Sequence, residues 1–381
     1  MRRVFTVLLT VAMVFMVGMP VMAQGLVSPI AIEPIRIGVY LPMTGEVAYL
    51  GQRAWDGILA AKEMQPSLVG REVKLFLEDT KSDRNQSVEV VEHLIRWEKV
   101  SAIIGEVISS DSIAAGPLGD KYQVPMVTPG ATNPRVTEGK KYYFRVCFSD
   151  TLQGEVAANL AVKTLKAKTA AVIIDISQDY CIGLANYFVK SFVKLGGEVL
   201  NTTYIGTGEK DFRTKLATVQ AAKPDMIYAP DYYTEVALLA RQAKELGINV
   251  PILSGDGAET EEVIKLGGKA VEGMYVTGLF SEGAITTKLG KDFQAFYEKK
   301  YNRGLDASSA TGADAYFVLL DAMKRADSTA GPELREALAH TKDFQGVSGT
   351  ISIGEDGNAV KDVVIKQVKD GKFVYVTSIS P

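Results

Sequence analysis

The feature that most constrains the fold is a regular alternation of strand-like and helix-like segments along the chain. Apolar runs such as 35–41, 72–79 and 100–105 have the composition of buried strands, and the segments between them carry apolar side chains at helical spacing. A second series covers residues 170–255 and keeps the same order. Repeated strand–helix–strand units predict parallel sheets covered by helices on both faces, so the expected fold class is α/β.

Two series of this kind predict two lobes. Both open with the same plan, and no low-complexity linker separates them. After Gly278 the sequence is mainly helical, and its end consists of short strand-like segments divided by Asp-Gly pairs, which signal hairpins. We therefore expect two lobes that are joined by several crossing strands, with a hinge and a cleft between them.

The first residues have the order of a secretory signal. Arg2 and Arg3 precede a nearly unbroken apolar run over residues 4–19, and short side chains lead to Ala23. We expect residues 1–23 to be a signal peptide that is removed after about Ala23, which leaves an exported, soluble protein. An uncleaved membrane anchor is the alternative, because the apolar run approaches the length that spans a bilayer.

Composition and missing motifs argue against several classes of function. The formal net charge of −3 provides no basic surface for nucleic acid. The chain has no dinucleotide-binding glycine motif, no P-loop, no G-x-S-x-G elbow and no H-E-x-x-H. We therefore expect no catalytic residue, no cofactor and no metal site. Export would permit a disulfide between Cys147 and Cys181, and the sequence leaves open whether they pair.

Unusual polar and aromatic residues follow the ends of the expected strands. In open parallel α/β sheets, ligands bind beyond the carboxyl ends of the strands. The stretch "PMVTPGATNP" places almost bare backbone and a hydroxyl at such an end. These loops offer donors for a carboxylate and acceptors for an ammonium group. The candidate residues are Ser109, Gly130, Ala131 and Thr132 in the first series, and Asp150, Tyr180, Tyr232 and Asp256, expected at the strand ends of the second.

Each of these residue types also has an ordinary structural role. Serine caps helices, aspartate occurs in solvated turns, and tyrosine packs half-buried at strand ends. Two carboxylates and two tyrosines at the ends of one sheet favour a binding site over a set of unrelated structural roles.

With these motifs the sequence resembles the Leu/Ile/Val-binding protein family, the type I periplasmic substrate-binding proteins of ABC importers. The resemblance runs from "IRIGVYLPMTG" to "GTISIGEDGNA", and its most specific pieces are "PMVTPGATNP", "GEKDF" and "AVEGMYVT". It implies two Rossmann-like lobes with the ligand cleft between them. On this pattern, residues 35–150 and 280–354 form lobe 1, and residues 151–279 and 355–381 form lobe 2.

The resemblance also implies a role for each candidate residue. The loops at Ser109 and at Gly130, Ala131 and Thr132 would hold the α-carboxylate and α-amino groups of an amino acid. Asp150 and Asp256 would face the ammonium, and Tyr180 and Tyr232 would close over the ligand from the second lobe. Leu50 stands where the family often has a large aromatic residue, which predicts a deeper side-chain pocket. The family's common disulfide near the first lobe is missing, because that region holds no cysteine.

The function implied by the resemblance is capture of a free hydrophobic amino acid, which is Leu, Ile or Val with Phe as a further candidate. The protein would act as a monomer in the periplasm and deliver its ligand to the permease of an ABC transporter in the inner membrane. An alternative is a binding protein or sensor for another small ligand, such as an amide or an aromatic acid. That alternative keeps the fold but lacks one half of the zwitterion site.

Overall fold

The computed structural model describes Glu33–Pro381, and the expected signal peptide lies outside the described residues. The described chain contains a six-stranded sheet in the order β2-β3-β1-β4-β5-β6 and a seven-stranded sheet in the order β16-β15-β11-β10-β9-β7-β8. Both sheets are mostly parallel, which confirms the α/β class. None of the described helices combines the length and the apolar character that a membrane span requires.

The six-stranded sheet is parallel except at its β2 edge, where β2 pairs antiparallel with β3. Strands β4 and β5 are buried along their whole length, as expected for strands covered by helices on both faces. The strands are β1 (Ile35–Leu41), β2 (Ser67–Leu68), β3 (Arg71–Asp79), β4 (Ala102–Gly105), β5 (Met126–Thr128) and β6 (Tyr143–Arg145).

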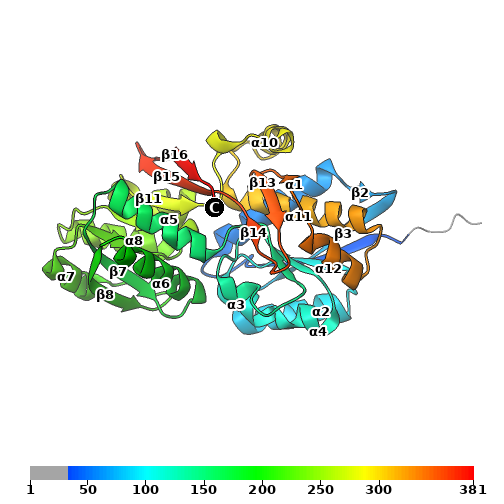
Figure 1. The fold of residues 1–381 in the computed structure, drawn as a ribbon, viewed down its shortest axis with the longest axis horizontal. Helices are drawn as coiled ribbons and strands as arrows, with labels where there is room; N and C mark the ends of the chain where they lie inside the picture. Colours follow the sequence, from blue (N-terminus) through cyan, green and yellow to red (C-terminus); the bar gives the residue numbers. More distant parts are fainter. Residues whose placement is uncertain (1–32) are drawn as a thin grey trace, which may run out of the picture. The chain divides into compact units, whose positions relative to one another are not determined.

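Helices from two distant parts of the sequence lie beside this sheet (Figure 1). The N-terminal set is α1 (Ala48–Met64), α2 (Arg84–Arg96), α3 (Ser109–Ala115), α4 (Pro117–Tyr122) and the short η1 (Pro134–Val136), and the later set is α11 (Ala307–Ala326) and α12 (Gly331–Ala339). Helix α11 packs closely on α1. The approach is so close at Gly57 that an added Cβ would lie 1.9 Å from the Ser309 carbonyl oxygen. The absence of a side chain there lets the two backbones approach.

The seven-stranded sheet combines five parallel strands with a C-terminal hairpin. β15 pairs antiparallel with β11 and with β16, and the β15–β16 turn contains one of the Asp-Gly pairs read from the sequence. The strands are β7 (Thr169–Asp175), β8 (Glu198–Ile205), β9 (Met226–Tyr228), β10 (Ile252–Ser254), β11 (Tyr275–Gly278), β15 (Val363–Lys369) and β16 (Lys372–Ile379). The helical segments before and between them are α5 (Asp150–Lys163), which precedes β7, α6 (Asp179–Lys194), α7 (Arg213–Ala222), α8 (Tyr233–Glu245), η2 (Asp256–Ala258), α9 (Glu261–Gly267) and η3 (Gly268–Ala270).

The chain passes between the two sheets three times, after β6, after β11 and before β15. The segment between the second and third passages contains η4 (Glu282–Ala284), α10 (Lys288–Tyr301) and a small antiparallel sheet of β12 (Phe344–Gln345), β13 (Thr350–Ile353) and β14 (Ala359–Val360). The backbone N–H of Arg145 in β6 donates to the Gly357 carbonyl at 3.0 Å, which ties the β13–β14 turn to the six-stranded sheet. We propose the lobe boundaries given above, with one change: because β14 pairs with β13, the last boundary moves from 355 to after Val360.

Candidate ligand-binding site

A closed cavity lies where the carboxyl ends of the strands in both sheets meet. Most of its lining residues are buried, so it is largely shielded from solvent. Its walls follow β4, β5, β7, β9, β10 and β11, as expected for a site at strand ends. The lining residues are Leu50, Val107, Ser109, Gly130, Tyr180, Tyr232, Asp256, Gly257, Glu259, Leu279, Ala307, Ser308 and Thr311.

The structure brings most of the candidate residues together around this cavity. Six of them line it directly, and the other three are buried and do not line it. The direct six are Leu50, Ser109, Gly130, Tyr180, Tyr232 and Asp256, and the others are Ala131, Thr132 and Asp150. Their roles toward a ligand stay predictions.

Ser109 is the first residue of α3 and does not cap it. The N-cap is Ile108, which forms no side-chain cap, so the ordinary capping role considered for this serine does not apply. Ser109 Oγ instead accepts a hydrogen bond from the backbone N–H of Asn133 at 3.2 Å. The hydroxyl proton therefore remains available to donate into the cavity that Ser109 lines.

The small residues of the loop after β5 suggested that its backbone amides are free to bind a ligand, but two of them are already hydrogen-bonded. The amides of Gly130 and Ala131 both donate to Thr128 Oγ1, at 3.2 and 2.9 Å. The buried Thr132 hydroxyl has no hydrogen-bond partner among the described residues. Arg145 is fully buried. Its guanidinium holds the loop in place by donating to the carbonyl of Thr132 at 2.5 Å. The Thr132 hydroxyl thus makes no hydrogen bond within the usual distance limit, but it lies near Asp150 and lowers the pKa of that carboxyl.

Asp256 lines the cavity, and only one of its carboxylate oxygens is hydrogen-bonded within the described residues. Tyr180 Oη and Gln153 Nε2 each donate to Asp256 Oδ1 at 2.9 Å. No hydrogen bond reaches Oδ2 from the described part of the chain, and Asp256 is partly exposed to the cavity that it lines. Burial raises the pKa of Asp256 to about 7, and the hydrogen bonds from Gln153 and Tyr180 oppose that shift. A cation placed against Oδ2 would favour the ionised form.

The position of Asp150 differs from the one that the sequence predicted. We expected it at the strand ends of the second sheet, but it follows β6 of the six-stranded sheet and begins α5. It is fully buried, and neither carboxylate oxygen has a hydrogen-bond partner among the described residues. Burial raises the pKa of Asp150 well above its ordinary value, and the charge of Asp256 raises it further. Asp150 does not line the cavity, and the charge of Arg145 opposes the rise of its pKa, so Asp256 is the carboxylate that a cation in the cavity would face.

The two tyrosines form one wall of the cavity. Tyr180 lies in the first turn of α6 and Tyr232 is the N-cap of α8, and their ring centroids are 5.4 Å apart. A Cβ at Gly255 would lie 2.3 Å from Tyr180 Oη, so glycine is required there for the hydroxyl to reach Asp256. Tyr180 is thereby fixed as a hydrogen-bond donor to the carboxylate.

Sequence reasoning missed several lining residues. Glu259 lies in the same loop as Asp256; its Oε1 is 2.7 Å from Lys366 Nζ, and its Oε2 accepts from the Leu279 N–H at 2.7 Å. The strand-end rule could have found it, because Glu259 lies three residues after Asp256 in the loop after β10. Ala307 and Thr311 lie in the first turns of α11, far from any strand end, and no local signal marks them.

Part of the cavity lining is apolar. It consists of Leu50, Val107, Leu279 and Ala307. The site therefore combines hydroxyl donors and carboxylates with an aliphatic surface. The free space in the cavity is only about 20 Å³, so these side chains must move outward to admit a ligand larger than a water molecule.

The cysteines do not form a disulfide. Cys147 and Cys181 are both free and buried, and Cys181 Sγ donates to Asp231 Oδ1 at 3.3 Å. The possible pairing that the sequence left open is therefore absent from the described structure.

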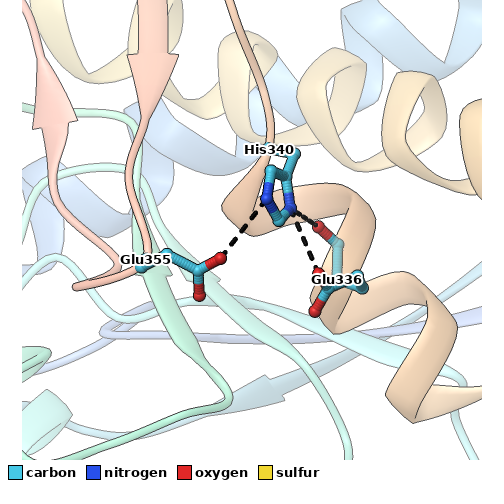
Figure 2. A group of neighbouring side chains, drawn as sticks. All are labelled: Glu336, His340 and Glu355. Atoms are coloured by element: carbon cyan, nitrogen blue, oxygen red, sulfur yellow. Dashed lines mark hydrogen bonds and ion pairs between the residues drawn. The ribbon is translucent and has the colours of Figure 1, made fainter.

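A separate surface cluster joins Glu336, His340 and Glu355 (Figure 2). His340 Nε2 lies 3.3 Å from Glu355 Oε1, and all three residues are exposed. Arg335 already pairs with both glutamates, at 2.7 and 2.8 Å. The cluster is an exposed ion-pair network outside the cavity.

Two α/β lobes with a closed polar and apolar cavity at their strand ends define a two-lobed receptor for a small ligand. The sequence profile of the periplasmic binding protein family matches residues 34–372. The chain therefore belongs to the periplasmic binding protein family.

Named relatives agree with this assignment. An amino acid binding protein from Pseudomonas aeruginosa is 32% identical over 74% of this chain and 75% of its own length. The crystal structure of the leucine binding protein LivK from Thermotoga maritima is 43% identical, with a TM-score of 0.90, over 91% of this chain and 99% of that one. The branched-chain amino acid transporter substrate binding protein LivJ from Streptococcus pneumoniae, solved with isoleucine, is 29% identical, with a TM-score of 0.86, over 92% and 100%.

The fold alone extends to proteins with other ligands. A solute binding protein from R. palustris, solved with benzoate, has a TM-score of 0.83 at 23% identity, over 91% of this chain and 97% of that one. The relatives are thus substrate-binding proteins of transporters, and the fold by itself does not select the ligand.

Proposed function

We propose that this protein captures a free hydrophobic amino acid, such as Leu, Ile, Val or Phe, and delivers it to the permease of an ABC importer. The observation that carries the proposal is the carboxylate of Asp256, a cavity-lining residue whose Oδ1 accepts two hydrogen bonds and whose Oδ2 accepts none from the described residues. An α-ammonium at Oδ2 would compensate the charge of a buried carboxylate. The apolar lining residues would contact the side chain of the ligand.

The remaining candidate residues would interact either with the α-carboxylate or with the α-ammonium group of the ligand. The hydroxyls of Ser109 and Thr132 can donate to the α-carboxylate, and Asp150 adds negative charge on the ammonium side. Tyr180 and Tyr232 cover the ligand from the second lobe when the lobes close. The leucine and isoleucine named for LivK and LivJ support a branched-chain ligand here.

An aromatic acid or an amide is the second candidate, supported by the benzoate-bound neighbour. Neither ligand carries a cation. Either would offer no cation to Asp150 and Asp256, so both carboxyls would have to be protonated, and an aromatic acid would in addition place its own carboxylate beside them. The amino-acid ligand is favoured for this reason.

Export, removal of residues 1–23, a periplasmic location and action as a monomer belong to the same proposal. The proposal includes no catalytic step, and neither cysteine thiol lines the cavity: Cys147 and Cys181 are both buried elsewhere.

We expect a thermal-shift panel of free amino acids to show stabilisation by Leu, Ile, Val and Phe. A ligand at about 100 times its dissociation constant adds about 2.7 kcal/mol to the free energy of unfolding, which gives a measurable rise in Tm. Purified protein should first be unfolded and refolded to remove ligand that co-purifies. A rise with polar or acidic amino acids alone would show that the apolar pocket is wrong.

Leu50 provides the matched variant for pocket size. A pocket deepened by Leu50 should favour the larger ligand, since each buried methylene contributes about 0.8 kcal/mol. If Phe outranks Leu in the panel, Leu50→Trp should reverse that order by filling the space. An unchanged order in Leu50→Trp would show that other residues set the size limit.

A further inference from the structure

The N-terminus of α6 in the second lobe forms ion pairs with charged groups of the first lobe. Asp179 is the first residue of α6. Arg135 Nη1 donates to Asp179 Oδ1 at 2.7 Å, and Arg84 Nη2 lies 3.1 Å from Oδ2. Arg84 begins α2 and Arg135 lies in η1, so two elements that accompany the six-stranded sheet reach one carboxylate beside the other sheet.

Neutral hydrogen bonds complete this contact. Ser110 Oγ accepts from the Asp179 backbone N–H at 2.9 Å and donates to Gln178 Oε1 at 3.1 Å. Asn133 Nδ2 donates to the Asp179 carbonyl at 2.7 Å. Arg84 Nη2 also donates to the Ser177 carbonyl at 2.8 Å. We call the group Arg84, Ser110, Asn133, Arg135 and Asp179 the α6 clasp.

The clasp is interleaved with the ligand-binding loops. Ser110 follows Ser109, Asn133 follows Thr132, and Asp179 precedes Tyr180. None of the five clasp residues lines the cavity. The same three loops therefore hold two kinds of group, one that faces the cavity and one that joins the lobes.

We propose that the α6 clasp acts as a latch: its contacts stabilise the closed state and slow ligand release. It does not affect which ligand the protein prefers. Every clasp contact joins one protein lobe to the other, so hinge opening must break all of them together. The apparent affinity of a ligand scales with the population of the binding-competent state, so a latch changes the affinity for all ligands by one factor. The inference rests on the proposed lobe closure and not on the identity of the ligand.

The test compares Arg84→Ala, Arg135→Ala, the double variant and Asp179→Asn with the wild type by stopped-flow and calorimetry, using Leu, Ile, Val and Phe. Exposed ion pairs contribute modestly, so each arginine variant should weaken binding by about 1.5- to 5-fold, mainly through faster dissociation. The factor should be the same for every ligand that binds. The affinity of the double variant should also depend less on salt.

Arg96→Ala is the matched control. Arg96 lies at the other end of α2 and pairs with Glu92 at 3.3 Å within the same helix. It should leave affinity and dissociation rate unchanged. A double-mutant cycle of Asp179→Asn with Arg135→Ala should show coupling, which separates the cross-lobe pair from a local effect of Asp179 on its own helix.

Wild-type affinity and dissociation rate in both Asp179→Asn and the double arginine variant would overturn the latch. So would losses that differ between ligands and change their ranking. If the wild type binds none of the four amino acids, the proposed function fails and the latch is tested on the free protein by X-ray scattering. A larger radius of gyration in the double variant than in the wild type supports the latch, and equal radii overturn it.

Discussion

Asp256→Asn should weaken the binding of a hydrophobic amino acid by between about 30-fold and a few thousand-fold, which corresponds to 2–5 kcal/mol. The asparagine keeps the size of the side chain and removes the charge that would face the ammonium. The loss is large because the buried ammonium would lose the carboxylate that it faces, and of the two candidate carboxyls only Asp150, which does not line the cavity, would remain nearby. Titration calorimetry with leucine measures it directly.

Asp211→Asn is the matched control for this substitution. Asp211 is also a lobe 2 aspartate, but its side chain is 68% exposed and pairs with Arg213 outside the cavity. Its variant should bind leucine as the wild type does. Near-wild-type affinity in a folded Asp256→Asn protein would mean that the ammonium is held elsewhere or is absent from the ligand.

The affinity for leucine should fall as the pH is lowered through about 7. In the free protein the pKa of Asp256 is raised to about 7, mainly by burial. A bound ammonium favours the carboxylate and lowers this pKa, so binding releases a proton below about pH 7. The affinity should then drop by up to about tenfold per pH unit, until the pH reaches the pKa that Asp256 has in the complex. Asp150, whose pKa is also raised by burial and by Asp256, can make the fall steeper.

The Asp256→Asn variant again supplies the control, because its weaker binding should vary less with pH across this range. Calorimetry in two buffers of different ionisation enthalpy counts the released protons. Circular dichroism at each pH checks that the protein stays folded. Equal wild-type affinity at about pH 5 and pH 7.5 would contradict the role given to Asp256.

Much of the fold could be predicted from local pattern. The alternation of apolar strands and amphipathic helices predicts parallel α/β sheets, and the Asp-Gly pairs at 356–357 and 370–371 lie in the β13–β14 and β15–β16 turns. The strand-end rule also placed Ser109, Tyr180 and Asp256 beside one cavity, because the carboxyl ends of parallel strands share an edge of the sheet.

What the sequence could not give depends on contacts between distant segments. Asp150 follows β6 because the chain crosses between sheets there, and no local pattern fixes the sheet to which a three-residue strand belongs. The amides of Gly130 and Ala131 are occupied by the Thr128 side chain, a local contact that composition does not reveal. Ala307 and Thr311 reach the cavity only through the packing of α11 on α1.

The central claim is that the cavity recognises both charged groups of an amino acid. Calorimetry with leucine, 4-methylpentanoic acid and 3-methylbutylamine tests it most directly, because the three share a side chain and the last two each lack one charged group. Leucine should bind, and each analogue should bind at least about 30-fold more weakly, since a buried charged partner is lost in either case. Binding of 4-methylpentanoic acid as tight as that of leucine would contradict the account and identify a receptor for organic acids.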